Sequence, residues 1–172
     1  MVKFHIMNKL KYLSHYHPDT QAQVHALIKK DKLAEHILGK YPRTHNIKTD
    51  KALFSYIMDY KNTHMKKSDP LSKALYDGKV QTYNALGTHR FVSRVQGGKL
   101  KAKNEIRVAP MFRSMPEEFL RMIVVHELAH FKEKEHNKAF YKLCEYMEPS
   151  YHQLEFDLRL YLTQMDLFNK LY

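Results

Sequence analysis

The sequence predicts an α+β protein in which a small antiparallel sheet packs against one long apolar helix. Three observations predict this fold. Apolar residues at helical spacing dominate residues 1–77, the apolar period changes to two over residues 79–108, and helical spacing returns from residue 117 onward. We therefore expect a helical N-terminal region at residues 1–77 and a second domain at residues 78–172 that ends in two helices. A chain of 172 residues is long enough to bury a sizeable core.

The N-terminal region is expected to contain short helices. Pro18 opens a helical pattern that continues to Gly39, with Pro42 beyond it. Asp50 can cap a second helix, and Asp69 is expected to start a short third helix through Leu75. The histidines of this region show no paired ligand spacing, so they are expected at the surface; they are His15, His17, His25, His36, His45 and His64.

The middle of the chain is expected to form the sheet. Asp77-Gly78 is typical of a turn, and residues 79–86, 90–96 and 100–108 have the alternation of strands, with Gly97-Gly98 as a connecting turn. Residues 90–113 contain many basic residues and one acidic residue, Glu105. This excess either binds an anionic group of a substrate or forms a solvated strand face. The basic residues are Arg90, Arg94, Lys99, Lys101, Lys103, Arg107 and Arg113.

The helix that follows is apolar over much of its surface and is expected to be buried. Ser114 and Glu117 have the spacing of a capping box at its start. Its second half contains His126-Glu127-Leu128-Ala129-His130. Residues four apart lie on one helical face, so His126 and His130 can bind one metal ion, and Glu127 can act beside it as a general base. A metal would also satisfy polar groups that are costly to bury.

A catalytic zinc needs a third protein ligand and an open position for water. We expect the third ligand to be His136. A continuous helix would carry His136 about 240° around the axis from His130, so the chain must turn before it. The rival ligands are Glu133, Glu135, His152 and Glu155.

Two helices are expected after His136, one from about Asn137 to Met147 and one from about Ser150 to Phe168. Cys144 is expected in the core of the first. Three residues are candidates for stabilising an oxyanion, although each is more often a packed or capping residue: Tyr141, Tyr151 and His152. Arg121 is expected to be structural.

Composition limits the class of protein. The net charge of +11 favours anionic partners. The only cysteine, Cys144, excludes an internal disulfide and fits a reducing compartment. The first residues lack the apolar run of a signal peptide, and no apolar run approaches the ~20 residues of a membrane span. We therefore expect a cytoplasmic protein without a membrane partner.

The chain resembles the YgjP-like metallopeptidase domain family. The resemblance rests on Val124–His130, on His136–Tyr141 and on Pro149-Ser150-Tyr151, and it covers roughly residues 80–165. It implies a zincin-like fold, with His126, His130 and His136 as zinc ligands and Glu127 as catalytic base. Some members of the family are described as pyrophosphatases that act on UTP, which implies the same possibility for this chain.

Three functions therefore remain open. The first is a zinc-dependent hydrolase of the metallopeptidase type, in which Glu127 takes a proton from a metal-activated water that attacks a carbonyl. The second uses the same site on a nucleoside triphosphate such as UTP. The third is a basic nucleic-acid-binding module with a structural metal, which no recognition motif supports. Three imidazoles also accept nickel or manganese, and the sequence leaves the oligomeric state open.

Overall fold

A computed structural model of the chain describes residues 10–80, 87–96 and 99–172. The chain divides into two compact units. One unit contains the chain up to Arg43 together with Gln153–Tyr172, and the other contains Thr44–His152. The sequence predicted a domain boundary at residue 77. The division into compact units does not test this boundary, which stays a prediction.

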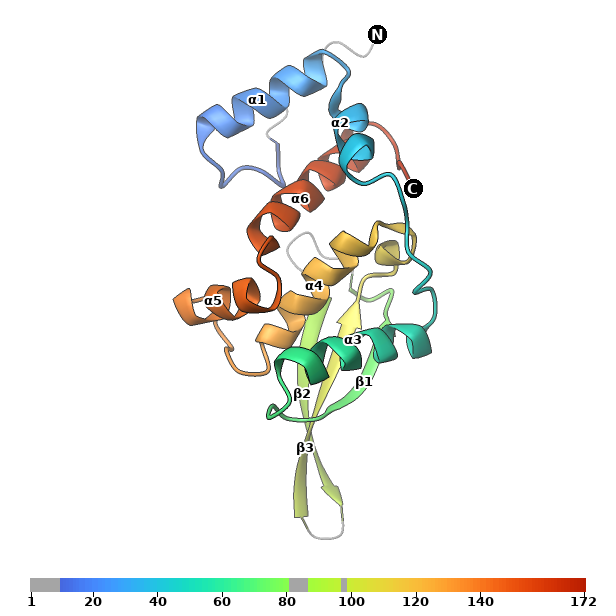
Figure 1. Cartoon of the computed structure of the whole chain (residues 1–172), viewed down its shortest axis with the longest axis vertical. Coiled ribbons are helices and arrows are strands. Elements are labelled where there is room, and N and C mark those ends of the chain that lie inside the picture. The colour runs from blue at the N-terminus through green and yellow to red at the C-terminus, as the bar shows by residue number, and fades with distance from the viewer. Residues whose placement is uncertain (1–9, 81–86, 97–98) are drawn as a thin grey trace. The chain divides into compact units, whose positions relative to one another are not determined.

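The second unit contains a sheet of three strands in the order β1-β3-β2. Strand β1 covers Leu71–Tyr76, β2 covers Gly87–Gln96 and β3 covers Lys99–Val108. Strands β2 and β3 form an antiparallel hairpin and continue beyond the helices as a two-stranded ribbon (Figure 1). Strand β1 runs parallel to β3. The prediction of an antiparallel sheet is therefore wrong, because the sheet is mixed.

Strand β1 also replaces the short helix that was predicted from Asp69. Leu71, Ala74 and Tyr76 are buried, while Ser72 and Lys73 are exposed. Apolar residues three apart suit a helix, but a short apolar run cannot separate a helix from a strand. Pairing with β3 decides the conformation, because it satisfies the backbone of both strands.

The turn predicted at Asp77-Gly78 is confirmed, since the Val80 amide donates to the Asp77 carbonyl at 2.9 Å. Residues 79 and 80 lie outside any strand. The remainder of the predicted strand, residues 81–86, and the Gly97-Gly98 turn lie outside the described residues. The predicted strand at 90–96 is confirmed within β2, and the predicted strand at 100–108 is confirmed within β3.

Two helices of the second unit border the sheet. Helix α3 covers Asp50–His64 and contacts β1, and helix α4 covers Glu117–Ala129 and contacts β2. The Thr49 side chain, rather than that of Asp50, caps α3 by accepting a hydrogen bond from the Ala52 amide. Whether this arrangement is zincin-like stays a prediction.

Helix α4 is buried along most of its length, as its composition predicts. Its predicted capping box is wrong. Ser114 lies in a short 3-10 helix, η1, at Pro110–Ser114, and Pro116 is the N-cap residue without a side-chain hydrogen bond. Glu117 is not available to complete the box because its carboxylate accepts hydrogen bonds from Arg121, at 2.5 Å, and from the Tyr56 hydroxyl.

The two predicted C-terminal helices are confirmed. Helix α5 covers Lys138–Met147, and helix α6 covers Tyr151–Leu167. Cys144 is buried in α5 between Phe140 and Met147 on the same face, as expected.

The first unit consists of α1 at Pro18–Lys29, α2 at Leu33–Lys40 and the larger part of α6. The buried carboxylate of Asp157 accepts hydrogen bonds from Lys40 at 2.6 Å and from the Tyr41 hydroxyl at 2.5 Å, so its charge is paired within this unit. Within the described ranges, no helix combines the length and apolar character needed to cross a membrane.

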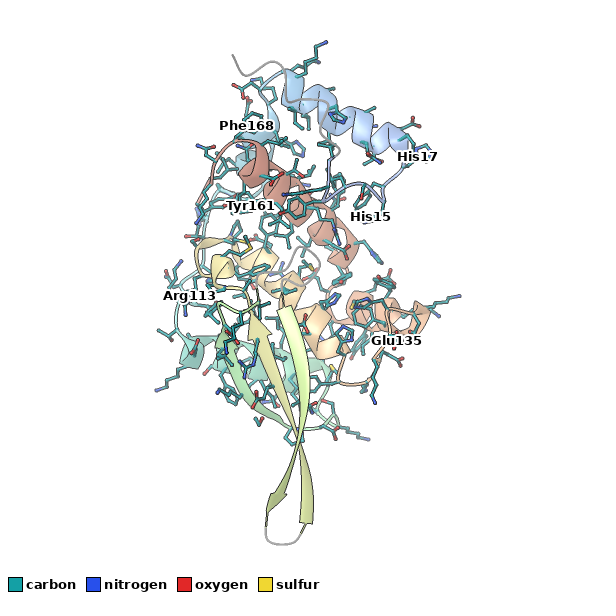
Figure 2. All side chains as sticks on the ribbon, turned by 180° about the vertical axis from the view of Figure 1, so that it is seen from behind. His15, His17, Arg113, Glu135, Tyr161 and Phe168 are labelled. Atoms are coloured by element: carbon teal, nitrogen blue, oxygen red, sulfur yellow. The ribbon has the colours of Figure 1, made fainter. Side chains whose placement is uncertain are left out.

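The surface position predicted for the six histidines of the N-terminal region is confirmed for three of them, while His25 and His64 are half-buried. His15 and His17 (labelled in Figure 2) and His36 are exposed. His45 is an exception, because it is only 7% exposed. Its Nε2 lies 2.7 Å from the Phe112 carbonyl oxygen, and its Nδ1 accepts a hydrogen bond from the Ile47 amide at 2.9 Å. A carbonyl can only accept, so Nε2 carries the proton of a neutral ring.

Burial lowers the pKa of His45 below its ordinary value, against a smaller opposite effect of the Phe112 carbonyl. Between this lowered pKa and the unfolded value of about 6.5, the unfolded chain binds more protons than the folded chain. The stability that neutral His45 contributes is therefore present above about pH 6.5 and is lost as the pH falls below it.

We predict that His45→Gln lowers the free energy of unfolding by roughly 1–3 kcal/mol at neutral pH, because buried hydrogen bonds are lost. The difference from wild type should shrink as the pH falls below about 6.5, since glutamine does not titrate. Urea unfolding across this pH range measures the difference. His36→Gln, at an exposed position of α2, is the control. A difference that is constant with pH would contradict the prediction.

Candidate metal centre

The chain turns where the sequence requires it to turn. Helix α4 ends at Ala129, and His130 is its C-cap residue. The amides of Lys132 and Glu133 both donate to the Ala129 carbonyl, at 3.1 and 3.0 Å, which closes the helix end. The chain then runs through an exposed segment to Asn137, the N-cap residue of α5. Figure 2 labels Glu135 in this segment, directly before His136.

The turn brings three imidazoles together. The Nε2 atom of His136 lies 3.1 Å from Nε2 of His126 and 3.1 Å from Nε2 of His130. One ligand atom from each residue lies within 4.8 Å of the other two. His126 and His130 are half-buried and His136 is exposed, so the group opens to solvent on the His136 side. In the part of the chain that the structure describes, no other group of three potential ligands meets this condition.

The donor set fits a metal ion. Four-coordinate zinc with Zn–N bonds of 2.0–2.1 Å places its nitrogen ligands roughly 3.3 Å apart, close to the separation observed here. The Nδ1 of His130 lies 2.9 Å from the Glu133 carbonyl oxygen, which can only accept a hydrogen bond. In the neutral ring Nδ1 therefore carries the proton, and Nε2 presents a lone pair to the other imidazoles. This is the state that a metal requires of a histidine ligand.

The apolar ring of Phe140 packs against all three imidazoles. Its ring centroid lies 4.9 Å from that of His126 and 4.7 Å from those of both His130 and His136. Phe140 is fully buried, and its amide donates to the side-chain oxygen of Asn137 at 2.9 Å. Sequence reasoning assigned Phe140 to the core only. Its position three residues after the Asn137 cap, in the motif that includes His136, was the available signal.

The His126 ring is held from its other side. Its Nδ1 lies 2.7 Å from the hydroxyl oxygen of Tyr151, which is fully buried at the start of α6. Glu127 follows His126 on α4 and is only 2% exposed. The structure thus brings the three predicted ligands together, and it places the predicted base on α4 beside His126, with His130 as the C-cap residue of the same helix.

The rival ligands have other contacts. Glu133 approaches the group with its backbone carbonyl, and its carboxylate accepts a hydrogen bond from the side-chain Nδ2 of Asn137 at 3.5 Å. Glu155 is paired with Arg159 at 3.3 Å. Glu135 is exposed in the segment before His136. His152 is paired with Glu145 at 2.8 Å.

The three oxyanion candidates have different surroundings. The Tyr141 ring lies 6.4 Å from that of His136 and 5.6 Å from that of His152, by ring centroids. Tyr141 and His152 therefore form an aromatic pair beside the open side of the group. Tyr151 is instead in contact with His126, so its hydroxyl faces a ring nitrogen of the group.

Two basic residues expected to attract anions are already paired. Arg107 contacts Asp77 at 2.5 Å and Glu105 at 3.3 Å. Arg113, labelled in Figure 2, lies 4.7 Å above the Tyr76 ring centroid and 4.0 Å from Asp50. The side chains of the other basic residues in the sequence cluster, Arg90 to Lys103, lie outside the described residues.

Three convergent imidazoles and a neighbouring buried glutamate, on a helix that ends within the motif, are the arrangement of a metal-dependent hydrolase. Comparison with known proteins agrees. The family model described as "YgjP-like, metallopeptidase domain" matches residues 92–161. The chain is 58% identical over 162 residues to a protein of Escherichia coli (strain K12) named UTP pyrophosphatase, over 94% of this chain and 97% of that protein. No solved structure matches the chain.

The chain belongs to the YgjP-like metallopeptidase domain family. Membership makes it a metal-dependent hydrolase, and the family implies a bound metal ion, for which the three histidines are a suitable group.

We predict that Asn137→Ala lowers the free energy of unfolding by about 1 kcal/mol, because the amide of Phe140 loses its capping acceptor. Asn137→Ser restores an acceptor at the same position and should recover most of this loss. Urea unfolding of the metal-free proteins measures both changes. Equal stability of the alanine and serine variants would contradict the prediction.

Proposed function

We propose that this protein is a metal-dependent nucleoside triphosphate pyrophosphatase that acts on UTP. The observation that carries the proposal is the 58% identity to the Escherichia coli protein named UTP pyrophosphatase, over nearly the whole of both chains. The convergent histidines supply a suitable hydrolytic site. The net charge of +11 favours a polyanionic substrate.

His126, His130 and His136 would hold the metal, and we propose zinc as the ion, because neutral imidazoles suit zinc among the common divalent metals. When bound, such a metal supplies Lewis acidity that activates water and stabilises developing negative charge. The Phe140 ring excludes water from one side of the three imidazoles, which strengthens electrostatic interactions there.

Glu127 is the proposed general base. It follows the ligand His126 on α4, so its carboxylate starts from a backbone position beside the ligands. Its role is to accept a proton from the attacking water. Water then adds across the phosphoanhydride bond between the α- and β-phosphorus atoms, and UTP gives UMP and pyrophosphate. The proton taken by Glu127 returns to solvent or to the leaving group.

The triphosphate also needs cationic partners. Arg107 and Arg113 already pair with carboxylates, which leaves them less suited to this role. We propose that Arg94 of β2 and Lys101 of β3 contact the phosphates. Arg94 and Lys101 are paired in the register of the β2–β3 hairpin, so two basic residues lie opposite each other on adjacent strands.

A second candidate function is peptide hydrolysis at the same site, with a carbonyl as the electrophile. The family description, metallopeptidase domain, favours it. For both candidate functions we predict a zincin-like arrangement of the sheet and α4. We also predict a location in the cytoplasm for both.

We predict that Glu127→Gln lowers kcat for pyrophosphate release from UTP by about 100-fold or more, because the proton acceptor is lost. Zinc content should remain close to that of wild type, because the three imidazoles are unchanged. Release of pyrophosphate from UTP and elemental analysis of the same samples measure the two effects. Glu118→Gln, on the first turn of the same helix, is the control and should retain activity.

Full activity of Glu127→Gln would refute the role of Glu127. If zinc-loaded wild type releases no pyrophosphate but cleaves an unstructured protein substrate such as casein, the peptidase function replaces the proposed one.

We predict that the double variant Arg94→Glu, Lys101→Glu raises KM for UTP by about tenfold or more, which corresponds to a loss of at least about 1.4 kcal/mol of binding free energy. Steady-state kinetics with UTP measure it. The control is Lys66→Glu, Lys67→Glu, which changes the net charge equally at exposed positions between α3 and β1. Equal changes of KM in both double variants would indicate an effect of net charge alone and would contradict a local phosphate contact.

A further inference from the structure

The hydroxyl of Tyr151 contacts the ring of His126 at Nδ1, which is not the nitrogen that lies near His136. Its side chain is fully buried, and its hydroxyl oxygen lies 2.7 Å from Nδ1 of His126. Nε2 of the same ring lies 3.1 Å from Nε2 of His136. The two nitrogens of His126 therefore have separate partners, one inside the protein and one in the proposed metal site.

The position of Tyr151 is fixed relative to α4 by a short chain of hydrogen bonds. Arg121 of α4 donates to the Glu148 carboxylate at 2.6 Å. The other oxygen of this carboxylate accepts from the Ser150 amide at 3.0 Å, and the Glu148 carbonyl accepts from the Tyr151 amide at 2.9 Å. Arg121 and His126 belong to the same helix, so the contacts lead from α4 to the start of α6 and back to α4.

Either Nδ1 of His126 or the Tyr151 hydroxyl carries the proton of the hydrogen bond between them. Which of the two donates determines whether Nε2 of His126 can bind a metal. A neutral imidazole has one N–H and one lone pair. If Nδ1 donates to the tyrosine oxygen, Nε2 presents its lone pair to the site. If the tyrosine donates instead, Nε2 carries the proton and cannot bind a metal.

His130 has no such choice, because its Nδ1 faces a carbonyl oxygen, which only accepts. The first arrangement at His126 makes both helical histidines equivalent donors.

We propose that Tyr151 is a positioning residue for the metal centre, whose hydroxyl oxygen accepts the Nδ1 proton of His126 and so holds Nε2 as a lone-pair donor. The inference rests on the proposed function only in its assumption that the three histidines bind a metal. It assigns Tyr151 a role different from oxyanion stabilisation, because its hydroxyl is engaged with a ligand ring.

The test uses the full chain and the variant Tyr151→Phe, with Tyr146→Phe as the control. Tyr146 lies on α5 and is 64% exposed, and its ring contacts His64 rather than the three proposed ligands, so the control removes the same hydroxyl group outside the proposed metal site. Zinc affinity is measured by competition with a chromophoric chelator. Loss of an outer partner of a metal-bound histidine typically weakens metal binding about 10- to 100-fold, and this is the expected effect of Tyr151→Phe. The Tyr146→Phe control should bind zinc as wild type does.

A second measurement tests the wild type directly, so its main result does not depend on whether Tyr151→Phe folds. Long-range proton–nitrogen NMR spectra of the metal-free wild type, at about pH 9 where imidazoles are neutral, report which nitrogen of His126 carries the proton. The expected result is the Nδ1–H form in wild type. In Tyr151→Phe, a mixture of the two forms is expected.

An Nε2–H form of His126 in wild type, or zinc affinity in a folded Tyr151→Phe variant within about twofold of wild type, overturns the proposal. Both results are possible in an enzyme that hydrolyses UTP, so they refute the inference alone. Conversely, the Nδ1–H form and weakened zinc binding in Tyr151→Phe support the inference even if wild type does not hydrolyse UTP.

Discussion

The approach of His136 Nε2 to within 3.1 Å of Nε2 of both His126 and His130 is the constraint on which the rest of this unit depends. When the protons of His126 and His130 lie on Nδ1, both rings turn Nε2 lone pairs toward His136, and only a proton or a cation at that point can satisfy them. Lone pairs that face one another repel unless a proton or a cation lies between them. A bound cation that accepts all three lone pairs would stabilise this arrangement.

Several otherwise unrelated features of the chain serve this meeting point. The buried helix α4 and its C-cap residue supply two of the rings, and the end of the helix at Ala129 allows the chain to reverse and bring in His136. The Asn137 cap starts α5 in the direction that places Phe140 beneath all three rings. Each feature involves residues that are close together in the sequence. Each contributes to the site by bringing an imidazole or the Phe140 ring to the same place.

The sequence predicted the features that depend on residues close together in the chain. The spacing of His126 and His130 on a helix, and the need for a turn before His136, could be stated from the sequence because both follow from helical geometry. Strand β1 could not, since six residues with apolar positions three apart suit a helix until β3 offers its backbone. The buried position of His45 was also missed, because its partner Phe112 lies 67 residues away. The contact between Tyr151 and His126 likewise joins different helices across 25 residues, a distance at which spacing carries no signal.

The burial of Cys144 has a consequence for the chemistry of the centre. Cys144 follows Phe140 by one turn of α5, yet its thiol faces the core, and the chain has no other cysteine. A metal held by the three histidines would therefore have imidazole nitrogens and no thiolate as protein ligands, and imidazoles are of intermediate softness and are not oxidised as thiolates are. Such a centre would not favour thiophilic ions such as copper(I), and peroxide would have no sulfur ligand to attack. The proposed donor set would therefore remain intact under oxidising conditions that inactivate a cysteine-ligated hydrolase.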